Sequence, residues 1–477
     1  MILYFFKNFA FLLILNVLIK PVWVFMIDIP IQNTVGHDVY GMYFTAFNFS
    51  FIFSILSDLG LNHYNNINLA DKSLEKNLSV TQILPFKILI SVGYIVVTSL
   101  VSIFVFKSSA VRYFVLLTAL FHSLNSLVLF VRTYLSSQRL FKYDSVFSIF
   151  DKFISTLVLG ILIYFIHGID LTIELFLFVQ IVSLLISIST LFHVLGEEAL
   201  FKIKVYKIRF LWLRDAMPYT VLILLMGFYT RIDSTLIQLI LENKDAGIYA
   251  ASYRLIDFLS QFGYLSSVIL LPLFSSLKKE KEALSPLLVY TSNFMMIAAL
   301  ILSIVLMINS TMICKLLYRH SAYEINDVFR LHLIAYPFVV LNFILGSYIT
   351  AFKSIRFLIL ISIVGVCIQF SGNILLLNYI GLAGAPFVMI ITQFWIFISQ
   401  LLWIIRKHDL KPLFEWDSLL ILLFGVTALA GSFLSIALLI YCAALFIGAA
   451  GVWVFRRRDY ISGPLLGLFI AKLRRGE

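Results

Sequence analysis

The chain has 477 residues, of which 61% are hydrophobic and only 13% are charged. A soluble domain averages about 25% charged residues, so a water-soluble fold of this length is excluded. The formal net charge of +11 does not indicate a nucleic-acid partner, because the basic residues stand in short connections between apolar runs. Cys314, Cys367 and Cys442 are scattered, so neither a metal site nor a disulfide framework is expected.

Long apolar runs follow one another along the whole chain, and each is long enough to cross a bilayer as a helix. A β-barrel would instead show short alternating segments, which the sequence lacks. The first run is too long for a signal-peptide core, so we interpret it as a span. Fourteen spans are predicted, at residues 9–29, 41–62, 80–106, 111–135, 146–167, 171–195, 216–241, 247–272, 285–310, 329–352, 357–380, 383–405, 417–436 and 438–455. The longest outer connection expected between them is residues 311–328.

The basic residues are distributed unequally between the two sides that these spans define. Of the 36 lysines and arginines, 24 fall in the even-numbered connections and the two termini, and five fall in or at the edge of the odd-numbered connections. Basic loops stay in the cytoplasm, so both termini are predicted to be cytoplasmic. Two basic termini on one side also favour an even number of spans.

The second half of the chain repeats the first half. Residues 26–28 and 40–48 resemble residues 231–233 and 246–254 at offsets of 205 and 206, and residues 134–142 resemble residues 348–356 at an offset of 214. The expected architecture is therefore an all-α, polytopic membrane protein with a six-helix bundle at 1–200 and a second at 201–411. Two extra helices and a basic tail complete it at 412–477. Because six is even, both bundles enter the membrane in the same direction, as in transporters with parallel repeats.

Ionisable residues inside the spans are costly and usually face a polar cavity. Those near the cytoplasmic ends can extend to the membrane surface, so we interpret them as anchors. These are Lys87, Arg132, Asp151 and Lys152. Asp58, close to the inner end of the second span, is interpreted as a residue that bonds at a helix end or between helices.

The deeper charged residues are harder to explain as anchors. They are Lys20 on the first span, Arg231 and Asp233 on the seventh, and Arg254 and Asp257 on the eighth. One interpretation is two internal ion pairs that hold the seventh and eighth spans together. The other is a basic lining for an anionic head group, to which Lys20 contributes from the opposite half. Pro21 and Pro337 lie inside spans, where each is either a hinge or a static kink.

The motifs of common enzymes are absent from the sequence. It has no Walker-type phosphate loop, no HExxH and no GxSxG, so ATP hydrolysis and catalysis are not expected. No cofactor is expected either. The connections between spans are too short for the catalytic loop that a membrane polysaccharide polymerase needs.

Six short motifs resemble those of one known family. They are Gly41-Met42-Tyr43, Ser57-Asp58-Leu59-Gly60-Leu61, Met217-Pro218 with Arg231-Ile232-Asp233, the stretch from Ala246 to Leu255, Leu271-Pro272-Leu273-Phe274 and Gly381-Leu382-Ala383-Gly384-Ala385. With these motifs the chain resembles the Wzx-type lipid-linked oligosaccharide flippases of the multidrug/oligosaccharidyl-lipid/polysaccharide exporter superfamily. The resemblance covers about residues 1–405.

This resemblance implies a flippase in the bacterial inner membrane that moves an undecaprenyl-pyrophosphate-linked glycan toward the periplasm. The glycan would serve a surface polysaccharide such as O-antigen or capsule. The resemblance also implies a cationic central cavity, for which the candidates are Arg254, Arg231 and Lys20. Asp233, Asp257 and Asp58 are candidates for ion coupling or ion pairing, and protons, sodium and the membrane potential all remain open as energy sources.

Membrane lipids and the polysaccharide polymerase machinery are the further partners implied, and no nucleic acid is expected. Two alternatives stay open. One is a cation-coupled multidrug exporter of the same superfamily, and the other is a membrane polysaccharide polymerase.

Overall fold

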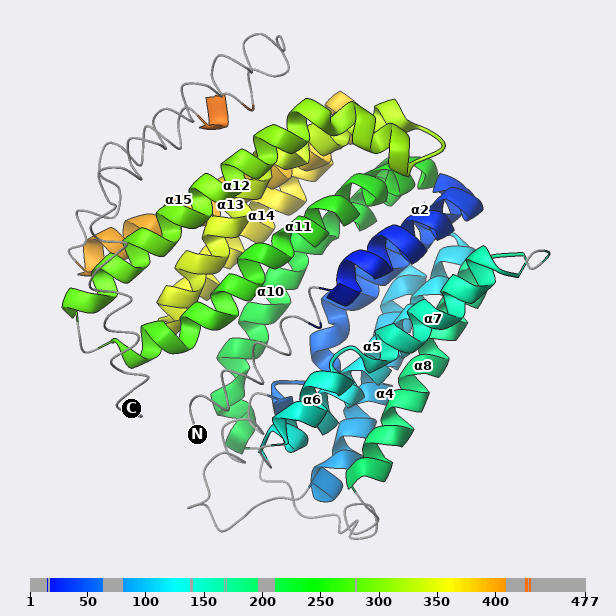
Figure 1. Cartoon of the computed structure of the whole chain (residues 1–477), viewed down its shortest axis with the longest axis horizontal. Coiled ribbons are helices and arrows are strands. Elements are labelled where there is room, and N and C mark those ends of the chain that lie inside the picture. Colours follow the sequence, from blue (N-terminus) through cyan, green and yellow to red (C-terminus); the bar gives the residue numbers. More distant parts are fainter. Residues whose placement is uncertain are drawn as a thin grey trace. The chain divides into compact units, whose positions relative to one another are not determined.

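The computed structural model is entirely helical wherever it has regular structure, which confirms the all-α, multi-spanning fold class for the described residues (Figure 1). Those residues are 15, 18–62, 80–137, 140–166, 168, 170–195, 211–278, 281–408, 425–427 and 429.

The helices have the following bounds: η1 Val24–Asp28, α2 Ile29–Phe53, η2 Ser54–Ser57, α4 Val80–Val105, α5 Ser109–Ser137, α6 Phe141–Phe147, α7 Phe150–Tyr164, α8 Ile173–Leu195, α10 Leu211–Ile240, α11 Asn243–Ser276, α12 Lys281–Leu317, α13 Ala322–Ala351, α14 Ile355–Ile380, η3 Gly381–Ala383 and α15 Gly384–His408.

Ten helical runs among the described residues are long and apolar enough to cross a membrane. Two of these runs, Leu18–Ser57 and Ile355–Lys407, each contain two helices. The described helices therefore account for the first twelve predicted spans. The last two predicted spans, 417–436 and 438–455, lie outside the described residues except for positions 425–427 and 429.

Two predicted connections are wrong. The stretch between the first two spans, residues 30–40, is helical apart from Gly36, whose φ of 80° breaks the helix. The long outer connection at 311–328 is also mostly helical, since α12 continues to Leu317 and α13 begins at Ala322. Polar residues mark where a chain leaves the lipid, but a helix that extends beyond the membrane surface keeps its own backbone bonds and does not need to stop there.

The described residues form two compact units, one ending at Ala251 and the other beginning at Ser252, within α11. The first unit contains α2 through α10 and the first turns of α11. A cluster of buried apolar residues packs its helices together around Phe130, Leu135 and Leu184. The second unit contains the rest of α11 and α12 through α15. The six-helix bundles at 1–200 and 201–411 remain a prediction.

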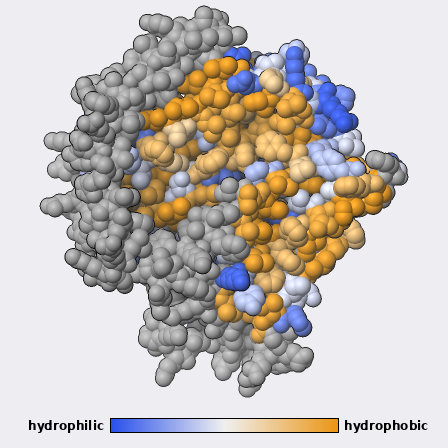
Figure 2. All heavy atoms as spheres, viewed as in Figure 1, coloured by the Kyte–Doolittle hydropathy of each residue, from blue (hydrophilic) through white to orange (hydrophobic). Residues whose placement is uncertain are grey.

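Helix α4 shows which side of a span faces lipid. Its most exposed apolar residues recur about every turn: Ile88, Leu89, Val92, Val96, Leu100, Ile103 and Phe104. Large apolar side chains also cover much of the described surface in the view of Figure 2. A continuous apolar stripe on a helix in this composition is a lipid-facing surface.

The helix before Gly36 accommodates a proline without leaving a backbone group unbonded. Pro30 has no N–H, so the Met26 carbonyl oxygen loses its usual α-helical donor. The hydroxyl of Tyr164, on α7, donates to that oxygen at 3.0 Å. Just before Pro30 the chain forms the π-helical segment η1, in which the N–H of Ile29 bonds to the Val24 carbonyl oxygen. Such π segments relieve local crowding in helices.

Two glycines bring α2 and α11 into backbone contact. A Cβ on Gly41 would meet the Asn243 carbonyl oxygen and lie 2.7 Å from the Gly247 nitrogen. A Cβ on Gly247 would meet the His37 carbonyl oxygen and lie 2.8 Å from the His37 Cα. The contact is reciprocal, because each glycine touches the residue four before the other. The glycines are separated by the repeat offset of 206, so repeated segments cross here as they do at a two-fold interface.

We expect Gly41→Ala to destabilise the protein by about 1–3 kcal/mol, because the added methyl group overlaps backbone atoms that no rotamer change can move. The measurement is the thermal unfolding midpoint of the detergent-solubilised protein. Gly93→Ala on α4 is the control, since a Cβ there meets nothing within 4 Å. Equal midpoints for Gly41→Ala and the wild type would contradict the close crossing.

Candidate functional site

The charged residues predicted to lie deep in the spans are all on helices, with different degrees of burial. Lys20 and Arg231, in the first unit, are half-buried, as are Arg254 and Asp257, in the second unit. Asp233 is only 2% exposed. A half-buried arginine within a span needs either a polar partner or a polar space, because exposing its charge to lipid is costly.

Two aspartates at repeat-related positions are held by tyrosines on the following span. Asp28 accepts a hydrogen bond from the Tyr40 hydroxyl at 2.8 Å, and Asp233 accepts one from the Tyr249 hydroxyl at 2.7 Å. Both carboxylates are 2% exposed. Each bond satisfies one oxygen of a buried carboxylate and ties consecutive spans together.

Arg231 lies against an aromatic ring. Its Cζ atom is 5.3 Å from the centre of the Phe51 ring on α2. Asp233 stands two positions further along α10, and positions two apart on a helix do not share a face. The seventh span thus directs its guanidinium toward α2 and its carboxylate toward Tyr249 on α11.

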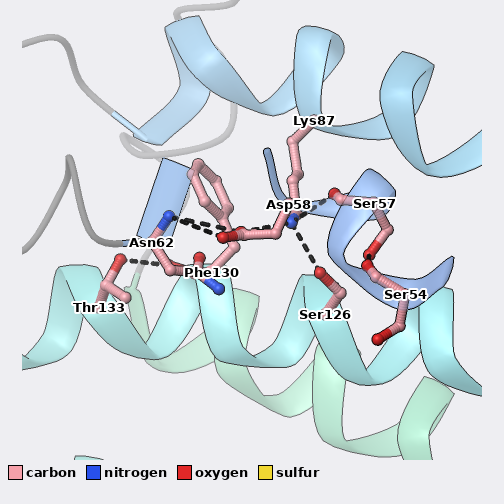
Figure 3. A network of polar contacts seen from close by, with 8 residues as sticks. All are labelled: Ser54, Ser57, Asp58, Asn62, Lys87, Ser126, Phe130 and Thr133. Carbon is pink, nitrogen blue, oxygen red and sulfur yellow. Dashed lines mark hydrogen bonds and ion pairs between the residues drawn. The ribbon is translucent and has the colours of Figure 1, made fainter. Parts of the chain in front are cut away.

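Lys87 forms the centre of a buried polar network at the end of the second span (Figure 3). Its Nζ lies 3.0 Å from Asp58 Oδ1 and donates to the Ser57 carbonyl oxygen and to Ser126 Oγ, both at 2.7 Å. The Phe130 ring is 5.9 Å away. The interpretation of Lys87 as a surface anchor is wrong, because the side chain is 0% exposed. It turns inward, where an acid and two oxygens bind it, instead of extending to the surface.

The backbone around Asp58 explains why a lysine is needed there. Helix α2 tightens into the 3₁₀ turn η2 and then breaks, with positive φ at Leu59 (47°) and Gly60 (82°). The break leaves the Ser57 carbonyl oxygen without a helical donor, and Lys87 supplies one. The Asp58 carboxylate also accepts the backbone N–H of Asn62 at 3.4 Å, so it bonds at a helix end and between helices.

Arg132 is another predicted anchor that has a partner inside the protein. Its Nε donates to Asp144 Oδ1 at 2.8 Å, with both side chains mostly buried. This ion pair joins the C-terminal end of α5 to the short helix α6. This ion pair was not predicted from the sequence, because Asp144 lies in a predicted connection between two spans.

The second unit contains a buried histidine that sequence reasoning did not select. His332 Nδ1, on α13, lies 2.6 Å from Ser252 Oγ, on α11. In the first unit, 214 and 206 residues earlier, Thr118 Oγ1 donates to the Ala46 carbonyl oxygen at 3.2 Å. The two offsets are those of the sequence repeat, so residues at equivalent positions are in contact in both units.

Amide side chains form a second polar region in the second unit. Thr392 Oγ1 donates to Gln369 Oε1 at 2.6 Å, and Asn342 Nδ2 donates to Gln393 Oε1 at 2.8 Å. These bonds join α14 to α15 and α13 to α15. Hydrogen bonds between spans hold helices together in lipid. These amide residues were not predicted from the sequence, because uncharged polar residues within apolar runs do not stand out as charged residues do.

The predicted hinges lie within helices. Pro21 is followed directly by the π-helical segment η1, and Pro337 stands inside α13. Their role as hinges remains a prediction. Among the described residues, no group of three or more histidine, cysteine, aspartate or glutamate side chains could hold a metal ion.

The described architecture is that of a multi-pass helical membrane protein, and solved structures share its fold. It matches a structure of the lipid II flippase MurJ, in an inward closed conformation, with a TM-score of 0.68 and 14% identity over 97% of this chain and 100% of that chain. An inward-facing multidrug resistance MATE transporter of the MOP superfamily matches with a TM-score of 0.66 and 12% identity, over 82% and 96%. A MOP superfamily transporter from Pyrococcus furiosus with a reversed polarity of its binding pocket matches with a TM-score of 0.53 and 13% identity, over 85% and 96%. At these identities the likeness shows the fold.

The family of this chain is shown by a match of its sequence to a family model. The model of the polysaccharide biosynthesis protein family matches residues 5–278, which is more than half of the chain, so this chain belongs to that family. This family match confirms the resemblance to Wzx-type flippases. No curated protein matches the chain.

We expect Lys87→Met to destabilise the protein by about 3–5 kcal/mol, because it leaves the Asp58 carboxylate buried without its partner. The double variant Lys87→Met/Asp58→Asn should recover much of this loss, since it buries no charge. Thermal unfolding in detergent measures both, with the exposed Lys407→Met as a control. Purely additive effects of the two substitutions would refute a coupled pair.

Proposed function

We propose that this protein is a flippase that moves an undecaprenyl-pyrophosphate-linked oligosaccharide from the cytoplasmic to the periplasmic leaflet for surface polysaccharide biosynthesis. The observation that carries the proposal is Arg231. This permanently charged side chain is half-buried within a span, in a member of the polysaccharide biosynthesis protein family. A pyrophosphate is an anion that such a guanidinium binds through two parallel hydrogen bonds.

Arg254 and Lys20 are further candidates for binding the anionic head group. Arg254 lies in the motif that carries the family resemblance, and Lys20 lies next to Pro21 on the first span. Like Arg231, both are half-buried. Two or three cationic side chains are enough to neutralise a pyrophosphate, so the anion could leave the lipid–water interface without an uncompensated charge.

The proposed transport cycle is alternating access between two repeated bundles. The reciprocal crossing at Gly41 and Gly247 and the equivalent contacts of Thr118 and His332 support a two-fold related construction. The distribution of lysine and arginine supports a cytoplasmic location for both termini. The bacterial inner membrane is the proposed location, with the polymerase machinery as a downstream partner.

For the energy source, we propose that the membrane potential acts on the anionic substrate, which carries charge across the field. Asp233 and Asp58 support this, because each accepts a hydrogen bond or an ion pair within the protein. A vesicle assay with and without an imposed potential tests the proposal against proton or sodium coupling through Asp233, Asp257 or Asp58.

The second candidate function is a cation-coupled multidrug exporter, which the likeness to MATE transporters supports. An organic cation prefers a cavity lined by acids alone. The half-buried arginines of the seventh and eighth spans oppose such a ligand. The flippase is therefore the better supported of the two.

Arg254→Ala and Arg231→Ala test the flippase. Each is expected to lower the transport of lipid-linked glycan between the leaflets of reconstituted vesicles by about tenfold to a hundredfold, because a hydrogen bond to a charged group is worth about 1.5–3 kcal/mol. The exposed Arg406→Ala is the control. Full transport by both cavity variants, at normal levels of protein, would disprove the site. Efflux of a cationic dye without glycan transport would favour the exporter.

A further inference from the structure

Basic residues gather at one end of the second unit, where α11, α13 and α15 end and α14 begins. The connections predicted there are residues 273–284, 353–356 and 406–416, and they contain eight lysines and arginines against four acids. The distribution of lysine and arginine along the chain predicts that this end is cytoplasmic. Its exposed basic residues include Lys278, Lys353, Arg356, Arg406 and Lys407. None of these five side chains forms an ion pair with a described residue.

Contacts with aromatic rings and with one turn join this end into a single surface. Lys278 Nζ lies 5.1 Å from the centre of the Phe352 ring, directly before the turn between α13 and α14. Lys407 Nζ donates to Ser354 Oγ, within that turn, at 3.4 Å. The same Nζ lies 4.7 Å from the centre of the Trp403 ring. The lysines that follow α11 and end α15 are therefore both held against one turn.

The turn between α13 and α14 places a lysine where a glycine is usual. The Lys353 N–H bonds to the Thr350 carbonyl oxygen at 2.9 Å, and the Ser354 N–H bonds to the Ile349 carbonyl oxygen at 3.3 Å. This pair of bonds ends many helices and requires a left-handed residue, which is Lys353 with a φ of 56°. Only glycine takes that conformation without crowding its Cβ. A lysine kept in a strained conformation favours a role for its side chain beyond the fold.

This basic end continues a lipid-facing stripe on α14. Arg356, Leu360 and Ile363 are spaced at i, i+4 and i+7, so they lie on one face of the helix. All three are exposed, with 59% of Leu360 and 48% of Ile363 accessible. Large apolar side chains exposed along a span meet acyl chains. Arg356 therefore lies at the level where acyl chains give way to lipid headgroups.

We propose that Lys278, Lys353, Arg356 and Lys407 form a binding surface for the headgroups of anionic phospholipids. Basic residues at the surface of an anionic membrane are each attracted to the negative headgroups. The aromatic rings and the apolar stripe favour a lipid over a soluble acidic partner, because a lipid presents acyl chain and phosphate at adjacent depths. The inference goes beyond the proposed function and does not depend on which substrate is transported.

The test is a titration of the full-length protein, in a neutral detergent, with dioctanoyl phosphatidylglycerol. We expect Lys353→Gly to weaken binding about fivefold, the factor that one lysine contributes near an anionic lipid surface. The double variant Lys353→Gly/Arg356→Gln should weaken it about twentyfold to thirtyfold, because the two contributions add. Dioctanoyl phosphatidylcholine, which has no net charge, should bind the wild type and the double variant equally weakly.

Lys353→Gly separates binding from folding. Glycine suits the left-handed position, so the thermal unfolding midpoint of this variant should equal or exceed that of the wild type. Lys142→Gln is the matched control, since Lys142 is exposed and lies 214 residues before Arg356, at the equivalent position of the repeat. Its loss removes the same charge from the first unit and should leave phosphatidylglycerol binding unchanged.

Three results would overturn the inference. One is wild-type affinity of the double variant for phosphatidylglycerol. Another is an equal loss in Lys142→Gln, because net charge and not this surface would then set the affinity. The third is binding of farnesyl pyrophosphate more tightly than phosphatidylglycerol, with that binding lost in the double variant, because the surface would then take the transported anion instead of a membrane lipid.

Discussion

The lack of water in the hydrocarbon core is the constraint on which the rest of this structure depends. Any charge or backbone group that is not paired there has to be satisfied by the protein or by a polar space within it. Lys87 and Arg132 satisfy the constraint through acids on neighbouring helices. The guanidinium of Arg231 lies against an aromatic ring, with its Cζ atom 5.3 Å from the centre of the Phe51 ring.

The same constraint explains the backbone irregularities. Where Pro30 removes a donor, a tyrosine hydroxyl replaces it, and where α2 breaks at Leu59 and Gly60, a lysine does so. The glycines at the crossing of α2 and α11 allow two backbones to meet without side chains between them. A soluble protein would leave such groups to water. At both of these places the freed carbonyl oxygen has a named partner, so the chain bends there without leaving that oxygen unbonded.

The sequence predicted the spans well, because apolar run length depends only on bilayer thickness. The described residues of the first twelve predicted spans are mostly helical. The repeat offset of 206 separates the contacting Gly41 and Gly247, and the offsets of 206 and 214 relate the Thr118–Ala46 contact to the His332–Ser252 contact. Loops were predicted less well. Residues 30–40 remain helical because polarity marks the membrane surface and not the end of a helix.

The candidate site was predictable only in part. Charge within an apolar run selected Lys20, Arg231 and Arg254, because charge is rare there. The prediction that Lys87 extends to the membrane surface was wrong, since the depth of a residue along a helix does not determine which way its side chain points. The contact between Phe51 and Arg231 could not be predicted from the sequence, because one phenylalanine among 46 carries no signal until its neighbours are known.

The central claim is that Arg231 borders a polar space within the membrane, and cysteine labelling tests it most directly. In a protein whose three native cysteines are replaced by serine, Arg231→Cys should react with a charged, membrane-impermeant thiol reagent. Val92→Cys, at a 51% exposed position on the lipid-facing stripe of α4, should not react. Equal protection of both cysteines would contradict the claim, because Arg231 would then face lipid or a sealed interior.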